Sequence, residues 1–321
     1  MKVIRDNFTK TIKTPTIIVL GSFDGIHSGH RALINNAKNL AEEIKLKYNI
    51  EEVKIMVCTF RNHPLSVINK DVCPKLIMSN KEKRSLFKKL NVNILNFMEF
   101  NKELMSISPD SFIENLKKHY NAKGIVVGFN YRFGYKNLGD VDLLKKYSEI
   151  LDYELLVVKP VKVDGEVSSS SAIRHNIQEG NIEKANKFLN RPFMLSGRII
   201  KGKQIGRTID FPTVNLNYDK KFIVPKGGVY STVVEYNGTF YRGITNVGYN
   251  PTLQGKKLSI ETHILNFNRV IYGEEIKLYF IEKIREEKKF INIEELKNQL
   301  VRDKAYVGNK NYSQYEDEFP L

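Results

Sequence analysis

A glycine-rich turn between an apolar strand and an amphipathic helix constrains the fold of this chain more than any other stretch. The run 16–20 (TIIVL) is apolar after its first residue and predicts a buried strand. Apolar residues then recur at positions 33, 34, 37, 40, 41 and 44, which is the spacing of one helix face. The intervening turn, 21–30, holds three glycines and two histidines. Such a strand–turn–helix unit is typical of an α/β domain with a parallel sheet.

The residue types of this turn indicate phosphate binding. Glycine has no Cβ, so the backbone can approach a ligand closely, and the N-terminus of the following helix offers free N–H donors to an anion. His27 and His30, three residues apart, could face the same phosphate oxygens and are candidate catalytic residues. A lone histidine would more often be a surface or capping residue. The candidate phosphate-binding residues of the turn are Gly21, Phe23, Asp24, Gly25 and Gly29.

Length and composition favour a two-domain cytoplasmic enzyme. The 321 residues exceed one typical domain. No run reaches the roughly 18 apolar residues of a membrane helix, the N-terminus lacks the apolar core of a signal peptide, and two cysteines are too few for a disulfide framework. The net charge of +15 admits phosphorylated ligands, nucleic acid or an anionic membrane as partners. Because no arginine-rich tail is present, we expect small-molecule substrates and neither nucleic acid nor membrane.

The first half of the chain alternates between strand and helix patterns. Apolar runs at 53–60, 93–97, 124–128 and 153–158 predict further strands, separated by helical patterns. This alternation predicts a doubly wound parallel sheet, and the spacing His27-Ser28-Gly29-His30 resembles the HxGH signature of nucleotidylyltransferases, which implies a nucleotidylyltransferase-like fold. Ligands in such sheets bind at the carboxyl ends of the strands. The turn 21–30 and the loops 59–64 and 128–134 all follow strands, so we expect them at one edge of the sheet.

A serine run continues into the next helical pattern. The sequence SSSSAIR at 168–174 precedes helical spacing that ends near Gly180. A flexible linker is the ordinary interpretation of serine runs, but hydroxyls at a helix N-terminus suit phosphate, and Arg174 adds charge one turn on. We therefore expect Ser169, Ser170, Ser171 and Arg174 to bind phosphate.

The pattern changes near residue 191, where short alternating strands begin. Strands are expected at 193–200, 229–236, 239–247, 258–265 and 276–284, and Asn237-Gly238 is a strong hairpin signal. These strands predict a small antiparallel β-barrel with a C-terminal helix, whose packing face would include Leu296, Leu300 and Val301. The expected domains are 1–186 and 187–308, followed by a polar tail at 309–321.

Three features of the second half have residue types that suit a chemical role. Thr213 and Asn215 offer hard oxygen donors beside a proline and suit Mg²⁺, which commonly keeps several waters and shares substrate phosphates. Glu261 and His263 share one strand face, and a carboxylate on an inward face could act as a general base, although a solvent-facing glutamate is equally ordinary. A glycine-spaced basic stretch could cover phosphates through Gly202, Gly206, Arg207 and Thr208.

The ordered set of motifs resembles the bacterial bifunctional riboflavin kinase/FAD synthetase family over nearly the whole length. The first half matches the FMN adenylyltransferase pattern in the turn at 21–30, the TFxxHP-like loop at 59–64, the loop at 128–134 and SSSAIR at 169–174. The second half matches the flavokinase pattern in GRTxxFPTxN at 206–215, PxxGVY at 225–230 and ETH at 261–263.

The resemblance implies two reactions, riboflavin plus ATP to FMN, and FMN plus ATP to FAD. It implies that Glu261 deprotonates the ribityl hydroxyl while Thr213 and Asn215 hold Mg-ATP, and that His27, His30 and Arg174 stabilise charge on the ATP phosphates. Riboflavin, FMN and FAD would then be substrates or products rather than prosthetic groups. The flavin-binding residues implied for the first half are Asn62, His63, Asn130 and Arg132.

Three residues depart from the family pattern. Asn62 stands where proline is common, Asn130 where aspartate is frequent, and Asp210 where glycine is usual. Asp210 would bring a carboxylate close to the expected Mg-ATP site. Two alternatives remain at this point: another nucleotidylyltransferase with the HxGH turn, or a basic RNA-binding or regulatory protein that keeps the fold without activity.

Overall fold

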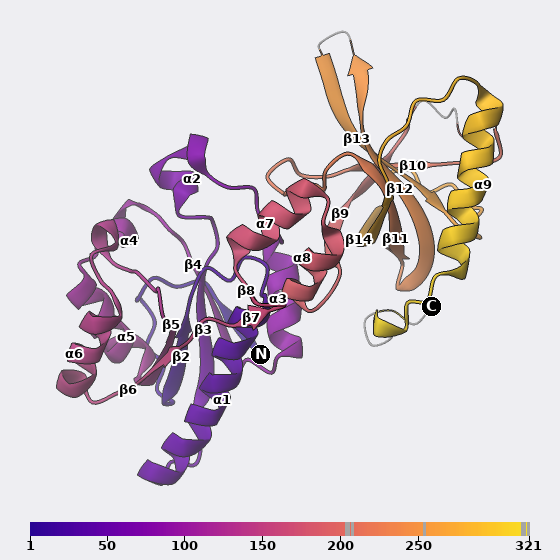
Figure 1. Cartoon of the computed structure of the whole chain (residues 1–321). Coiled ribbons are helices and arrows are strands. Elements are labelled where there is room, and N and C mark those ends of the chain that lie inside the picture. Colours follow the sequence, from indigo (N-terminus) through magenta and orange to yellow (C-terminus); the bar gives the residue numbers. More distant parts are fainter. Residues whose placement is uncertain (203–205, 207–208, 253–254, 316–318, 320–321) are drawn as a thin grey trace. The chain divides into compact units, whose positions relative to one another are not determined.

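The chain consists of two compact units (Figure 1). The computed structural model describes all residues except 203–205, 207–208, 253–254, 316–318 and 320–321. The first unit comprises Met1–Pro74 and Ser79–Ser169, and the second comprises Lys75–Met78 and Ser170–Leu321. Helices α7 (Ser170–Glu179) and α8 (Ile182–Leu189) thus belong to the second unit, whereas the boundary predicted from the sequence, between residues 186 and 187, falls inside α8.

The first unit is built on a six-stranded parallel sheet with the strand order β1-β4-β3-β2-β5-β6. The chain moves from β2 to one side through β3 and β4 and then returns to the other side at β5, so the order reverses beside β2. The strands are β1 (Lys2–Ile4), β2 (Thr16–Leu20), β3 (Lys54–Phe60), β4 (Ile94–Met98), β5 (Ala122–Gly128) and β6 (Glu154–Val158). The expected doubly wound sheet is confirmed, with β1 as an additional edge strand.

Helices cover both faces of this sheet. Ile17 on β2 lies close to Leu40 and Ile44 of helix α1, near Gly124 of β5, so this face packs on α1. The neighbouring Ile18 belongs to the cluster on the opposite face. The helices of the first unit are α1 (Ser28–Tyr48), α2 (Leu65–Ile68), α3 (Asn80–Lys89), α4 (Lys102–Ser106), α5 (Pro109–Tyr120) and α6 (Val141–Leu151), with two short 3-10 turns, η1 (Lys70–Val72) and η2 (Tyr135–Asn137).

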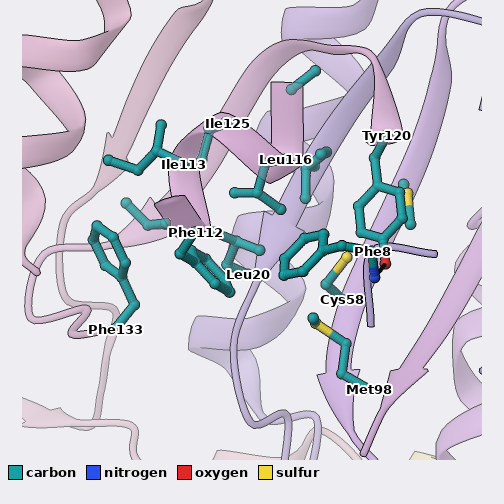
Figure 2. Packing of buried hydrophobic residues seen from close by; sticks show 14 of the residues in the cluster. Phe8, Leu20, Cys58, Met98, Phe112, Ile113, Leu116, Tyr120, Ile125 and Phe133 are labelled. Atoms are coloured by element: carbon teal, nitrogen blue, oxygen red, sulfur yellow. Dashed lines mark hydrogen bonds between the residues drawn. The ribbon is translucent and has the colours of Figure 1, made fainter. Parts of the chain in front are cut away.

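The cluster on the second face combines aliphatic packing with a buried polar group. Figure 2 shows Phe8 beside Cys58 and Tyr120, and the ring centroids of Phe8 and Tyr120 are 5.2 Å apart. The Tyr120 hydroxyl donates to the Asp6 carboxylate at 2.7 Å, and Asn96 bonds to both residues. Every polar side chain in this group has a partner, which is the condition under which burial of polar atoms is tolerated. This group ties the N-terminal segment to β4 and α5.

The second unit is a closed antiparallel barrel with the strand order β10-β13-β12-β11-β14-β9. Asn237 and Gly238 both have positive φ at the hairpin between β11 and β12, as the sequence predicts. The strands are β9 (Phe193–Ile200), β10 (Val214–Asn217), β11 (Gly228–Tyr236), β12 (Thr239–Thr252), β13 (Gly255–Ile264) and β14 (Glu275–Arg285). A two-stranded ribbon of the first unit, β7 (Lys162–Val163) and β8 (Glu166–Val167), was not expected.

The C-terminal helix of the second unit packs on the barrel through a different face from the one that the sequence pattern predicts. Helix α9 (Ile293–Asn309) buries Asp303 and Val307, whereas Val301, expected on the packing face, is 51% exposed. Asp303 is drawn inward because its carboxylate pairs with Arg285 of β14 at 2.8 Å. Beyond the helix, in the segment described as a polar tail, Phe319 is buried in a cluster with β11 and β14. Among the described residues, no helix has the length and apolarity needed to cross a membrane.

Candidate functional sites

The glycine-rich turn follows β2, where the strand order of the first sheet reverses. Phe23, Gly25 and Ile26 all have positive φ, at 50°, 97° and 44°. Positive φ is unfavourable for phenylalanine and isoleucine, and both side chains are completely buried, so packing holds the turn in this shape. Asp24 is buried as well, at 3% exposure. The turn is therefore a fixed structure that leads into the N-terminus of α1.

The two histidines stack at the start of α1. His27 is the N-cap residue, and its Nδ1 accepts a hydrogen bond from the Gly29 N–H at 3.2 Å. A neutral His27 consequently carries its proton on Nε2. The ring centroids of His27 and His30 are 3.8 Å apart, and the buried Nδ1 of His30 has no hydrogen-bond partner within the described residues. The expected pairing of the two imidazoles is present.

Burial controls the protonation state of His30. The pKa of His30 lies well below its usual value because the ring is desolvated and because His27 and Lys83 lie close to it. At neutral pH, His30 is therefore an uncharged imidazole. Such a ring acts on a phosphate as a hydrogen-bond donor rather than as a cation.

The loops after β3 and β5 hold the residues expected to bind flavin. Asn62 exchanges two hydrogen bonds of 2.9 Å with the backbone of Phe100, and His63 Nδ1 accepts from the N–H of Leu65 at 3.2 Å. Asn130 is exposed, and Arg132 pairs with Asp140 at 3.1 Å. Asn62 and His63 thus shape their own loop, and flavin contact by these four residues remains a prediction.

The serine run is divided between the two units. Ser169 ends the first unit, whereas Ser170 and Ser171 open α7 in the second. The guanidinium of Arg174 donates through Nε to the carbonyl of Lys75 at 2.8 Å. The helix begins where the sequence predicts, and phosphate binding by these residues stays a prediction.

On the barrel, the strand register brings the expected kinase residues together. Asn215 of β10 lies opposite Glu261 of β13, which in turn lies opposite Asn246 of β12. Register partners on adjacent strands point to the same face, so these three polar side chains form a row. Gly202 lies against this row, because a Cβ there would be only 2.2 Å from Asn215 Nδ2.

This row lies on the outer face of the barrel, so Glu261 has the outward one of the two positions that the sequence left open. Thr262, beside it in the strand, is 1% exposed and bonds to Thr245, which bonds to Thr232, both fully buried. Because successive side chains of a strand alternate, Glu261 points away from that buried interior. The alternating sequence gave the shared face of Glu261 and His263 but not which face was inside. An outward carboxylate is accessible to a substrate.

His263 fixes the loop that precedes β10. Its Nδ1 is 2.9 Å from the carbonyl oxygen of Pro212, and its ring packs on Phe211 with centroids 5.2 Å apart. Burial lowers the pKa of His263, so the neutral ring donates this hydrogen bond at neutral pH. Gly206 supports the same loop by accepting from the Phe211 N–H at 2.8 Å. Arg207 and Thr208 lie outside the described residues.

A cavity of about 500 Å³ adjoins Thr213. The segment 267–272 lines part of this cavity and was not predicted from the sequence, because it has no glycine-rich turn and no cluster of charges. Asp210, at the rim, has a φ of 63° and pairs with Lys297 of α9 at 3.3 Å. Aspartate tolerates this left-handed conformation better than most residues, which explains how it replaces the usual glycine. The lining residues are Asp210, Pro212, Thr213, Val214, Ile264, Phe267, Asn268, Arg269, Val270, Ile271 and Tyr272.

Comparison with known proteins identifies both halves. The FAD synthetase family model matches residues 9–172, and the riboflavin kinase family model matches residues 189–310. The bifunctional riboflavin kinase/FMN adenylyltransferase of Bacillus subtilis (strain 168) is 36% identical over 302 residues, covering 92% of each chain. The bifunctional riboflavin kinase/FMN adenylyltransferase of Listeria monocytogenes is 35% identical over 291 residues, covering 89% of this chain and 90% of the relative. A solved structure from Streptococcus pneumoniae, described as a macrolide-efflux protein, has a TM-score of 0.85 at 31% identity, covering 96% and 99% of the two chains.

The fold and the two matches define a transferase that joins a nucleotidylyltransferase-like unit to a flavokinase barrel. More particularly, the chain belongs to the family of bifunctional riboflavin kinase/FMN adenylyltransferases, since relatives above 30% identity cover nearly all of it. The family and enzyme class expected from the motifs are confirmed. The barrel match also removes the alternative of a different HxGH nucleotidylyltransferase, which would leave the second half unexplained.

Proposed function

We propose that the two reactions of this bifunctional enzyme are divided between the two units, with adenylyl transfer at the His27–His30 turn and riboflavin phosphorylation at the Asn215–Glu261 row. The first unit carries the FAD synthetase match and the second the riboflavin kinase match. The observation that carries the proposal is the strand register, which sets Glu261 beside Asn215, two residues from Thr213, on an accessible face.

For the kinase reaction, Glu261 is the general base. It takes the proton of the riboflavin 5′-hydroxyl, whose oxygen attacks the γ-phosphorus of ATP and releases ADP. The cavity beside Thr213 accommodates the nucleotide, and the His263–Pro212 hydrogen bond keeps the loop in position. Phosphoryl transfer depends mainly on positioning and charge neutralisation, which fits this small set of side chains.

The donor set at the barrel fits Mg²⁺ delivered with ATP. Within the described part of the chain, no group of three or more His, Cys, Asp or Glu residues could hold a metal by itself. Thr213 and Asn215 offer neutral oxygens, and Mg²⁺ commonly completes its shell with substrate phosphates and waters. These two residues would hold the ion, which when bound neutralises phosphate charge. Glu261, next to Asn215, stays available as the base.

For adenylyl transfer, the nucleophile is the FMN phosphate, which attacks the α-phosphorus of ATP and displaces pyrophosphate. No protein nucleophile is required. His27 and His30 donate hydrogen bonds to phosphate oxygens as negative charge moves to the leaving group. Ser169, the last residue of the first unit, supplies a further hydrogen-bond donor. Asn130 and Arg132 contact the flavin phosphate or the adenine.

The substrates ATP, riboflavin and FMN are the partners we propose, in the cytoplasm, without nucleic acid or membrane. Nucleic-acid binding would weaken steeply with salt, because it releases counterions from phosphates. Purified protein incubated with riboflavin and Mg-ATP should form FMN and then FAD. Chromatography of samples taken over time measures both products. Absence of both products, together with salt-sensitive RNA binding, would instead favour a regulatory protein that has kept the fold.

A further inference from the structure

Lys83 is a buried lysine next to the glycine-rich turn. It lies on α3 and is 7% exposed, and its ammonium donates a hydrogen bond to the carbonyl oxygen of Ser22 at 2.8 Å. Lysine is almost never buried to this extent without a specific partner. Ser22 belongs to the turn that carries both histidines, so Lys83 contacts the backbone of the candidate site directly.

Helix α3 supports the turn through two side chains on one face. Phe87, one helical turn after Lys83, packs edge-on against Phe23 with ring centroids 5.3 Å apart. Phe23 in turn contacts His30 at 4.9 Å between centroids. The Ser22 carbonyl also accepts a hydrogen bond from Thr59 Oγ1 of β3 at 2.8 Å, so its position does not depend on Lys83 alone.

The charge of Lys83 acts on the histidine pair. Asp24 attracts the ammonium electrostatically, and the ammonium disfavours a second positive charge on His30. The ionisable groups that act on His30 are thus His27 from the same turn and Lys83 from α3, and Asp24 acts in turn on Lys83. Since Thr59 also holds the Ser22 carbonyl, backbone support alone does not explain why a charged side chain occupies this buried place.

We propose that Lys83 is a positioning residue for adenylyl transfer, which fixes the turn through the Ser22 carbonyl and keeps His30 an uncharged hydrogen-bond donor beside a positive charge. Adenylyl transfer moves negative charge onto the pyrophosphate, and a charge held in a desolvated place acts more strongly than one in water. This inference rests on the assignment of adenylyl transfer to the first unit, which FAD formation by the wild-type protein checks separately.

The test compares Lys83→Met with Lys88→Met, a matched change at an exposed lysine of the same helix. FAD formation from FMN and Mg-ATP should fall at least about tenfold in Lys83→Met, while riboflavin phosphorylation by the same preparation stays within about twofold. The NMR titration of the His30 ring should move to higher pH, and the acidic limb of the FAD-forming pH profile should move with it. Lys88→Met should match the wild type in every measurement.

A fall of less than about threefold overturns the proposal. So does a larger fall without any change in the His30 titration, because lost packing would explain it. If Lys83→Met also loses kinase activity, Lys83→Arg provides the test. The pKa of Lys83 is lowered to about 8, so wild-type FAD formation should decline above pH 8, whereas arginine stays charged and removes that decline. Identical profiles for wild type and Lys83→Arg overturn the proposal.

Discussion

Replacing Lys83 by methionine is expected to stabilise the first unit even as it slows adenylyl transfer. Burial lowers the pKa of Lys83 from 10.5 to about 8. At about 1.4 kcal/mol for each pKa unit, the charged ammonium costs the folded state about 3 kcal/mol at pH 7. Methionine has a similar shape and no charge, but it gives up one hydrogen bond worth about 1 kcal/mol. The Ser22 carbonyl keeps its bond from Thr59, so no buried acceptor is left unpaired.

We expect the free energy of unfolding to rise by about 2 kcal/mol in Lys83→Met, which raises the thermal unfolding midpoint of the first unit by roughly 4–8 °C. Because the folded pKa lies below the unfolded one, the penalty is present in full below pH 8 and vanishes as the pH rises to 10.5. The gain of Lys83→Met should therefore shrink between pH 7 and pH 10. Calorimetry of the full chain at both pH values measures it, with Lys88→Met as the control. A variant less stable than the wild type at pH 7, or an equal gain at both pH values, would refute the reasoning.

Three further outcomes follow from packing and burial. Phe319→Ala should lower the stability of the second unit by about 3–4 kcal/mol in chemical unfolding, because the ring is 2% exposed in the barrel cluster; an unchanged midpoint would contradict that packing. Gly202→Ala should displace Asn215 and slow FMN formation, whereas Gly308→Ala, with open space around its Cβ position, should not; equal kinase rates would be the contrary result. The pKa of His30 is lower in the folded state than in the unfolded chain, so the ring contributes stability above pH 6.5 that is lost as the pH falls. His30→Asn should therefore flatten this part of the pH–stability curve. An unchanged curve would count against the buried neutral ring.

Local patterns were sufficient to predict most of the elements. The helix that begins after Ser79 has a capping box, in which the Glu82 carboxylate accepts a hydrogen bond from the Ser79 N–H, and α5 begins at Pro109 behind its N-cap Ser108. The turn 21–30 was also predictable, because its glycines and histidines follow a strand of unmistakable apolar character. These signals are local, so a sequence carries them without knowledge of the fold.

What could not be predicted depends on partners distant in sequence. The inward turn of Asp303 depends on Arg285, and the outward position of Glu261 depends on which threonines of other strands fill the barrel. Lys83 has the appearance of an ordinary solvent-facing helix residue within a charged stretch. Only the fold reveals that its ammonium meets the Ser22 carbonyl. The cavity wall at 267–272 likewise has no local signature.

The division of two reactions between two sites is tested most directly by complementation between single-site variants. Glu261→Gln should lose FMN formation by about 10²–10⁴-fold and still convert supplied FMN to FAD. The double variant His27→Asn with His30→Asn should make FMN and little FAD. Mixed in one tube with riboflavin and Mg-ATP, the two proteins should form FAD after a lag while free FMN accumulates. If Glu261→Gln still phosphorylated riboflavin at the wild-type rate, or if the mixture formed no FAD although both variants were folded, the two-site account would be contradicted.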